Sequence, residues 1–151
     1  MEKVEPIPEG FNTVTPNLVV QGGKDAIEFY KNAFEAKVRR IFYGPDGKTI
    51  FHAELEIGKS ILMLTEEIPI MNLFSPKSPG GGTSVSLYMY VDKVDDVFAK
   101  AISAGAIVKM PLIEIFYGDR CCTIIDPFGH IWTLATHIKN LTDEDIKRFL
   151  S

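Results

Sequence analysis

The chain contains two similar pentapeptides, Phe34-Glu35-Ala36-Lys37-Val38 and Ala104-Gly105-Ala106-Ile107-Val108, which lie roughly 70 positions apart. At each one, an amphipathic helical pattern ends and an apolar, strand-like pattern begins. The neighbouring segments keep about the same offset, which indicates duplication of one supersecondary unit. Each copy has one apolar helix face and one sheet, so we expect neither to be stable alone.

The first copy is predicted to run strand, helix, then three strands. The expected elements are a strand at 13–20, a helix at 25–35, and strands at 38–43, 49–57 and 60–65. Asp25 is the predicted N-cap of the helix, because its carboxylate can accept from the exposed amide groups. The Gly58-Lys59 pair predicts a tight hairpin, which places Glu54 opposite about Met63.

The second copy repeats this order and is followed by one more helix. The expected elements are strands at 84–91, 106–110, 120–125 and 131–137, and helices at 94–104 and 143–150. Gly105 is predicted to end the first of these helices, and Thr142 to cap the second. We interpret residues 1–151 as one domain: a first module at about 11–65, a linker rich in proline and glycine at about 66–83, and a second module at about 84–137.

Composition narrows the class of protein. The 151 residues are 46% hydrophobic and 24% charged with a net charge of −4, and no basic stripe suggests a nucleic-acid partner. No apolar run is long enough for a membrane span, and the first ten residues do not resemble a signal peptide, so we expect a cytoplasmic protein. The two cysteines, Cys121 and Cys122, are adjacent and therefore poor disulfide partners. They are read as small apolar strand residues, with a reactive thiol as the alternative.

Several motifs resemble one known family. The segments Ala26-Ile27-Glu28-Phe29-Tyr30 and Asp126-Pro127-Phe128-Gly129-His130-Ile131-Trp132 resemble the vicinal-oxygen-chelate superfamily, which includes glyoxalase, bleomycin-resistance and dioxygenase proteins. Further segments resemble its PhnB-like branch: Thr15-Pro16-Asn17-Leu18, His52-Ala53-Glu54-Leu55, Gly118-Asp119-Arg120 and Ala135-Thr136-His137. The resemblance implies an α+β fold in which two tandem βαβββ modules form a curved sheet around a cavity. It also implies a homodimer.

The resemblance raises the question of a metal. In metal-using relatives each module supplies two ligands, usually a His on its first strand and a Glu on its last. The equivalent positions here are about Thr15, Met63, Ser86 and Thr133, and none is a His or a carboxylate. Hydroxyls are poor ligands for zinc, nickel or iron. We therefore expect no metal and no cofactor.

Candidate ligand-binding residues follow from strand alternation. His52 and Glu54 are two residues apart on one predicted strand and point the same way, toward the cavity. Such a pair can hold a metal, tune a general base, or only satisfy each other. Tyr88 and Tyr90 are expected to share the cavity face of the second module, and Asn17 that of the first.

Other polar side chains have a structural alternative. Arg120 lies at roughly the pseudo-symmetric place of His52, where it would bind an anionic group or bridge to Asp119 or Asp126. Trp132 and the other two histidines, His130 and His137, are interpreted as structural.

Two hypotheses about function follow. The first is a binder of a small organic molecule that works without the family's metal. The alternative is a lyase, isomerase or epimerase of the superfamily that uses His52 and Glu54. A third, weaker hypothesis is an interaction module whose cavity is filled by side chains. The sequence assigns no catalytic residue.

Overall fold

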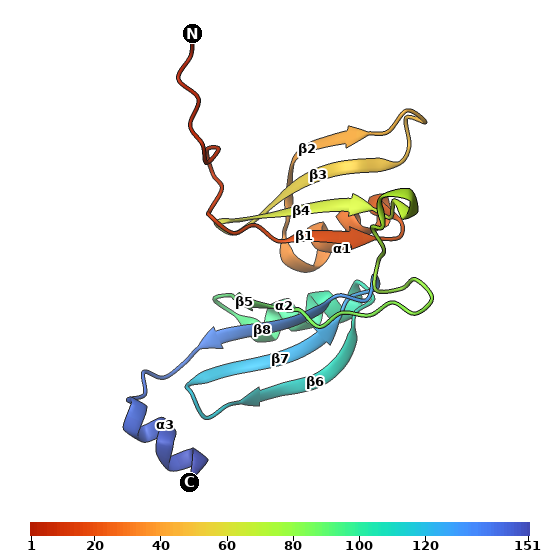
Figure 1. Ribbon diagram of the computed structural model, residues 1–151. Coiled ribbons are helices and arrows are strands. Elements are labelled where there is room, and N and C mark those ends of the chain that lie inside the picture. The colour runs from red at the N-terminus through yellow and green to blue at the C-terminus, as the bar shows by residue number, and fades with distance from the viewer. The chain divides into compact units, whose positions relative to one another are not determined.

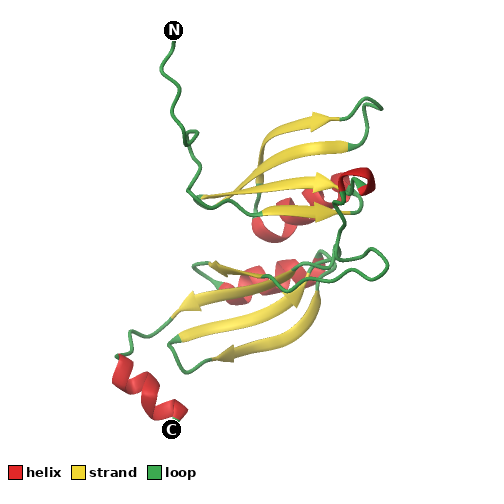
Figure 2. Cartoon of the chain, viewed as in Figure 1, coloured by secondary structure: helices red, strands yellow, loops and turns green.

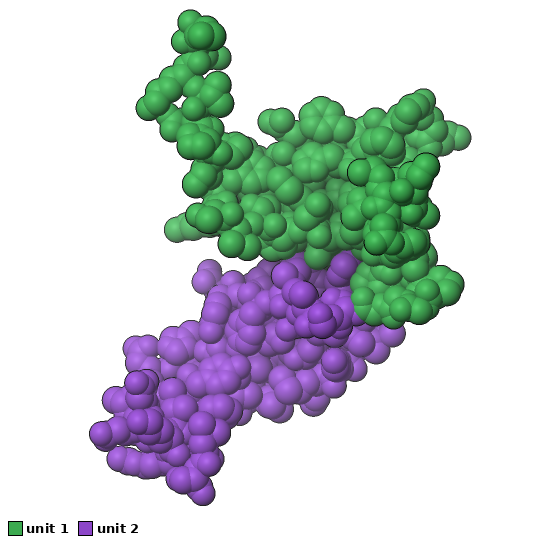
Figure 3. Space-filling model, viewed as in Figure 1, with its two compact units in different colours: residues 1–82 green, residues 83–151 purple.

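The computed structural model describes all 151 residues. The chain divides into two compact units, residues 1–82 and 83–151 (Figure 3). In each unit a four-stranded sheet has a helix against one face (Figure 2). We call the opposite face, which the unit's own helix does not cover, its open face.

The first unit has the predicted strand, helix and three strands. Its elements are β1 (Asn17–Val20), α1 (Gly23–Phe34), β2 (Lys37–Tyr43), β3 (Ile50–Ile57), β4 (Ser60–Glu66) and the short 3-10 helix η1 (Pro69–Met71). The strand order is β1-β4-β3-β2, with β1 parallel to β4 and the other pairs antiparallel (Figure 1). The core lies between α1 and the sheet, where Ala53, Leu55 and Leu64 are fully buried. Strand alternation places the side chains of His52 and Glu54 on the open face.

The second unit repeats this order of elements and adds a helix. Its elements are β5 (Ser86–Tyr90), α2 (Val94–Ser103), β6 (Ile107–Glu114), β7 (Asp119–Ile125), β8 (Ile131–His137) and α3 (Asp143–Leu150). The strand order, β5-β8-β7-β6, matches that of the first sheet (Figure 1). Thr136 of β8 accepts a 2.9 Å hydrogen bond from the Val94 amide at the start of α2, so the even-numbered residues of β8 face that helix. The predicted α+β fold of two modules is confirmed.

A buried aspartate explains the motif between β7 and β8. Asp126 Oδ1 accepts from the backbone amides of Phe128 and His130, and Oδ2 accepts from the Trp132 indole at 2.9 Å. Trp132 is buried, as predicted. The motif therefore fixes the turn and anchors the strand that follows it.

The start of α1 differs from the prediction. The helix begins at Gly23, directly after Gly22, whose φ of 79° is a left-handed conformation that favours glycine. Asp25 lies in the first turn and is not the N-cap, so that prediction is wrong. Instead, Glu66 of β4 accepts from the amides of Gly23 and Ile50, at 3.0 and 2.6 Å. A carboxylate from a distant strand does what a local cap was expected to do.

Other boundaries follow local chemistry more closely. Gly105 has a φ of 113° and follows the end of α2, and Thr142 caps α3 in a reciprocal capping box with Asp145. β6 extends to Glu114, beyond the predicted end at residue 110, with register shifts around its proline, Pro111. No helix of the structure has the length and apolar character needed to cross a membrane.

Candidate functional site

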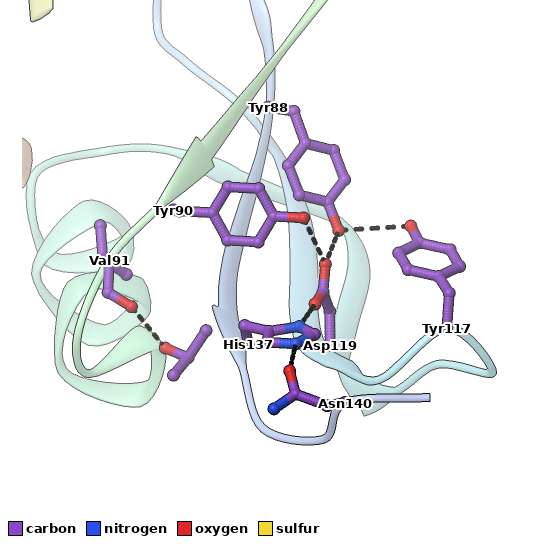
Figure 4. Close-up of polar contacts among 8 residues, drawn as sticks. Tyr88, Tyr90, Val91, Tyr117, Asp119, His137 and Asn140 are labelled. Atoms are coloured by element: carbon purple, nitrogen blue, oxygen red, sulfur yellow. Dashed lines mark hydrogen bonds and ion pairs between the residues drawn. The ribbon is translucent and has the colours of Figure 1, made fainter. Parts of the chain in front are cut away.

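Two tyrosines on the open face of the second unit converge on one carboxylate. Tyr88 and Tyr90 of β5 each donate a 2.8 Å hydrogen bond to Oδ2 of Asp119, the first residue of β7 (Figure 4). Asp119 is 1% exposed, whereas Tyr88 and Tyr90 are 43% and 62% exposed. Their ring centroids lie 5.2 Å apart. A buried anchor thus fixes two aromatic rings that remain open to the surroundings.

The other oxygen of Asp119 is also occupied. His137 Nδ1 lies 2.7 Å from Oδ1, and its Nε2 lies 2.9 Å from Oδ1 of Asn140. The hydroxyl of Tyr117, in the loop before β7, lies 3.2 Å from that of Tyr88. We call the six residues Tyr88, Tyr90, Tyr117, Asp119, His137 and Asn140 the Asp119 network.

The hydrogen bonds set the charges in this network. Burial alone would raise the pKa of Asp119, but hydrogen bonds from His137, Tyr88 and Tyr90 outweigh it and hold the pKa below its ordinary value. The hydrogen bonds to Asp119 and Asn140 raise the pKa of His137. The pKa of Tyr88 is raised, first by burial and then by its hydrogen bonds, and that of Tyr90 chiefly by its bond to Asp119. The network therefore favours a carboxylate paired with a protonated imidazole, next to neutral tyrosines.

The first unit has a different carboxylate on its open face. Glu54 is 6% exposed, and its Oε1 lies 3.2 Å from His52 Nε2. Its Oε2 is buried and makes no hydrogen bond. Arg40 Nε lies 3.4 Å from Oε2, close enough for an ion pair but without hydrogen-bond alignment. The ring of Phe42 stacks on His52 with centroids 6.1 Å apart. We call Arg40, Phe42, His52 and Glu54 the Glu54 cluster.

Asn17 belongs to the same open face as the Glu54 cluster. It pairs with Met63 of β4, which in turn pairs with Glu54 and so confirms the predicted hairpin register. One strand, β4, thus lies between Asn17 and the Glu54 carboxylate. The structure brings His52 and Glu54 into contact and leaves Asn17 exposed at the edge strand.

Arg120 does not lie with the tyrosines. Its guanidinium forms a two-point ion pair with Asp95 of α2, with Nε and Nη2 2.8 and 2.9 Å from the two carboxylate oxygens. This contact is on the helix-covered face, opposite Tyr88 and Tyr90. The structural alternative for Arg120, a bridge to a carboxylate, is realised with Asp95 rather than with Asp119 or Asp126.

The misplacement of Arg120 comes from the register. The two sheets correspond when Glu54 of β3 is matched with Thr123 of β7. Two positions earlier, His52 then matches Cys121 rather than Arg120. A shift of one residue along a strand moves a side chain to the other face of the sheet, because the side-chain period is two.

The two cysteines are free and buried. Burial raises the pKa of the Cys121 thiol, and it raises that of Cys122 to about 11. Both thiols are therefore protonated near neutral pH, which argues against the reactive-thiol alternative.

The donor groups of the chain do not fit a divalent metal. No three His, Cys, Asp or Glu side chains come together in a geometry that could hold an ion. His52 and Glu54 form only a pair, and Thr123 and Thr133 bring together two hydroxyls 3.1 Å apart. Carboxylate and imidazole ligands in sets of three or four are what zinc and its neighbours need.

Sequence reasoning missed Asp119, Tyr117, Asn140 and Arg40 as parts of these sites. Only the pattern Gly118-Asp119-Arg120 pointed toward the first of them. His137 was interpreted as structural, and the structure places it between Asp119 and Asn140 in the Asp119 network.

The architecture defines a class: α+β proteins made of two βαβββ modules. The model of the Glyoxalase/Bleomycin resistance protein/Dioxygenase superfamily matches residues 10–134. The chain belongs to this superfamily. An uncharacterised protein of Mycobacterium bovis is 37% identical over 140 residues, which cover 91% of each chain.

Solved structures with the same fold include two bacterial proteins. TioX from Micromonospora sp. ML1 is 25% identical, with a TM-score of 0.64 over 84% of this chain and 99% of that one. A PhnB protein from Bacillus cereus, described as a putative 3-demethylubiquinone-9 3-methyltransferase, is 20% identical, with a TM-score of 0.64 over 83% and 99%. The second likeness shows the fold alone.

Proposed function

We propose that the protein is a PhnB-like member of the superfamily that binds a small organic molecule on the open face of residues 83–151. It does so without the family's divalent metal. The observation that carries the proposal is the pair of exposed rings, Tyr88 and Tyr90, whose hydroxyls are both held at 2.8 Å by the buried Asp119.

The two rings are preorganised for binding. An exposed aromatic ring supplies a large contact area, and a ring already fixed by a hydrogen bond loses little entropy when a ligand stacks on it. The carboxylate that fixes both rings is fully buried and ion-paired. Two rings in fixed positions therefore suit a planar ligand.

The family resemblance also bears on the domain organisation, the oligomeric state and the cellular location. We propose that the two units form one domain, and that the protein is a cytoplasmic homodimer. Helix α3 supports the dimer: none of its residues is buried within the chain, and Phe149 and Leu150 are 67% and 69% exposed. Light scattering on the full-length protein measures the mass of the assembly, and a monomer would contradict this proposal.

The binding proposal is tested with a panel of planar aromatic compounds, by thermal shift and then by calorimetry on the hits. Compounds that raise the melting temperature of the wild type are expected to lose most of this effect in Tyr88→Ala and Tyr90→Ala. Tyr43→Ala is the matched control, because Tyr43 is an exposed tyrosine of the first unit. Equal binding by all four proteins would contradict a site at these rings. Elemental analysis that finds stoichiometric metal would overturn the metal-free part.

A second candidate function rests on Glu54. Its buried Oε2 without a hydrogen bond is a suitable proton acceptor, and His52 on Oε1 can orient the carboxylate. This arrangement favours a lyase, isomerase or epimerase that removes a proton from its substrate. Each ligand found in the panel is incubated with the protein, and NMR is used to look for product. Turnover that survives Glu54→Gln would exclude this role.

A further inference from the structure

Tyr88 and Tyr90, two of the three exposed tyrosines of the Asp119 network, have already used their only protons in hydrogen bonds. A tyrosine hydroxyl carries one hydrogen and can donate one hydrogen bond. Tyr88 and Tyr90 each donate theirs inward to Asp119 Oδ2 (Figure 4). Toward a ligand, each hydroxyl therefore offers only the lone pairs of its oxygen.

Tyr117 has also used its only hydroxyl proton in a hydrogen bond. Either hydroxyl could donate across the 3.2 Å contact between Tyr117 and Tyr88, taken by itself. The O–H of Tyr88 is donated to Asp119, so Tyr117 must be the donor in this contact. Tyr117 is 37% exposed, and its oxygen also presents only lone pairs. All three phenol oxygens at this face are thus hydrogen-bond acceptors.

His137 does not restore a donor. Its Nδ1 is directed at Asp119 and its Nε2 at the side-chain oxygen of Asn140, so a protonated ring uses both N–H groups within the network. The raised pKa values of Tyr88 and Tyr90 point the same way, because both phenols stay neutral and keep the O–H groups that they donate to Asp119.

We propose that this face prefers a planar ligand that carries a cationic, hydrogen-bond-donating group, such as an amidinium or an ammonium, over an anionic ligand of the same shape. The inference rests on the proposed binding function and specifies its ligand class. Aromatic faces attract cations, and phenol oxygens without a free proton can receive N–H groups but cannot donate to a carboxylate.

Three probes of one shape test this: benzamidinium, benzamide and benzoate. They are titrated into the full-length, isotope-labelled protein at constant salt, and binding is followed through the NMR signals of residues 86–90 and 119–123. We expect benzamidinium to bind about tenfold more tightly than benzoate, with benzamide between them. Benzoate binding at least as tightly as benzamidinium would overturn the inference but leave the binding function intact. If no probe shifts the signals of Tyr88 and Tyr90, both the binding function and the inference fail.

A variant that keeps the ring of Tyr90 but lacks its hydroxyl tests whether that oxygen causes the preference for a cation. Tyr90→Phe keeps the aromatic surface and removes one acceptor, so the ratio of benzamidinium to benzoate affinity is expected to fall severalfold. Tyr43→Phe removes a hydroxyl from an exposed tyrosine of the first unit and should leave the ratio unchanged. A ratio in Tyr90→Phe equal to that of the wild type would contradict the acceptor role of this hydroxyl.

Discussion

Glu54 of the first unit and Asp119 of the second are both buried carboxylates on the open faces of their sheets, and each has a histidine neighbour. They differ in how they are satisfied. Asp119 accepts from Tyr88, Tyr90 and His137, and both of its oxygens are used. Glu54 Oε1 contacts His52, whereas Oε2 has an ion pair with Arg40 at 3.4 Å but no hydrogen bond.

The difference indicates two different roles. A buried carboxylate with several donors braces the groups around it, because each donor stabilises the charge. A buried polar atom without a hydrogen bond costs about 1–3 kcal/mol and calls for an explanation, of which a functional role is one. We infer that Asp119 positions a binding surface, whereas Glu54 is available for chemistry.

The largest expected effect on stability comes from removing the Asp119 carboxylate. Asp119→Ala should lower the free energy of unfolding by about 3 kcal/mol, because it leaves Tyr88, Tyr90 and His137 without their shared acceptor. Asp119→Asn keeps one acceptor oxygen and should lower the free energy of unfolding by less. Urea denaturation of the two variants and the wild type measures the difference. A loss under about 1 kcal/mol in Asp119→Ala would mean that the network does not brace the face.

Replacing Glu54 should not lower the free energy of unfolding, in contrast to Asp119→Ala. Glu54→Leu is expected to leave the free energy of unfolding unchanged or raise it by up to about 1 kcal/mol, because a poorly paired buried charge gives way to an apolar side chain of similar size. The same urea titration measures it. A clear destabilisation would show that Arg40 and His52 satisfy Glu54 better than their geometry indicates.

The Asp119–His137 pair should give stability a defined pH window. The folded-state pKa of His137 is raised above its ordinary value of 6.5, so its contribution is complete below that pH and is lost as pH rises through the folded pKa. The folded-state pKa of Asp119 lies below its ordinary value of 3.8, so its contribution is complete above that pH and is lost as pH falls through the folded pKa. The pair therefore stabilises most between about pH 4 and 6.5.

The measurement is the difference in unfolding free energy between wild type and His137→Gln across pH 4 to 9. This difference should shrink as the pH rises. In an Asp119→Asn background the same histidine substitution should have a much smaller effect, because its partner is no longer charged. A difference that stays constant with pH would contradict an ionic contribution from this pair.

The smallest effect concerns Arg120. Because its guanidinium is on the helix-covered face with Asp95, Arg120→Ala should change the affinity of any ligand at Tyr88 and Tyr90 by less than about twofold. Calorimetry with a ligand from the panel measures this. A loss of about tenfold would restore Arg120 to the binding site, where sequence reasoning placed it.

Part of the molecule could be predicted from local patterns. The repeat, the order of strands and helices, the burial of Trp132 and the shared face of Tyr88 and Tyr90 all follow from short-range periodicity and turn chemistry. The pairing of Glu54 with Met63 also followed, because the two-residue hairpin at Gly58-Lys59 leaves little choice of register.

What depended on long-range contacts could not be predicted in this way. The carboxylate that fixes the start of α1 comes from β4, and the partner of Arg120 comes from α2. Strand alternation gives the face of a side chain only after the register is known. The register shifts in the β6–β7 pairing could not be predicted from local patterns.

The sequence by itself determined the family, the duplicated modules and the tyrosine pair, because these depend on residues close together in the chain. Only the tertiary structure showed that Asp119 satisfies both tyrosines while Glu54 keeps an oxygen without a hydrogen bond. The physical reason is that these hydrogen bonds depend on the distance and alignment between atoms from separate strands. Neither quantity can be derived from the order of the residues alone.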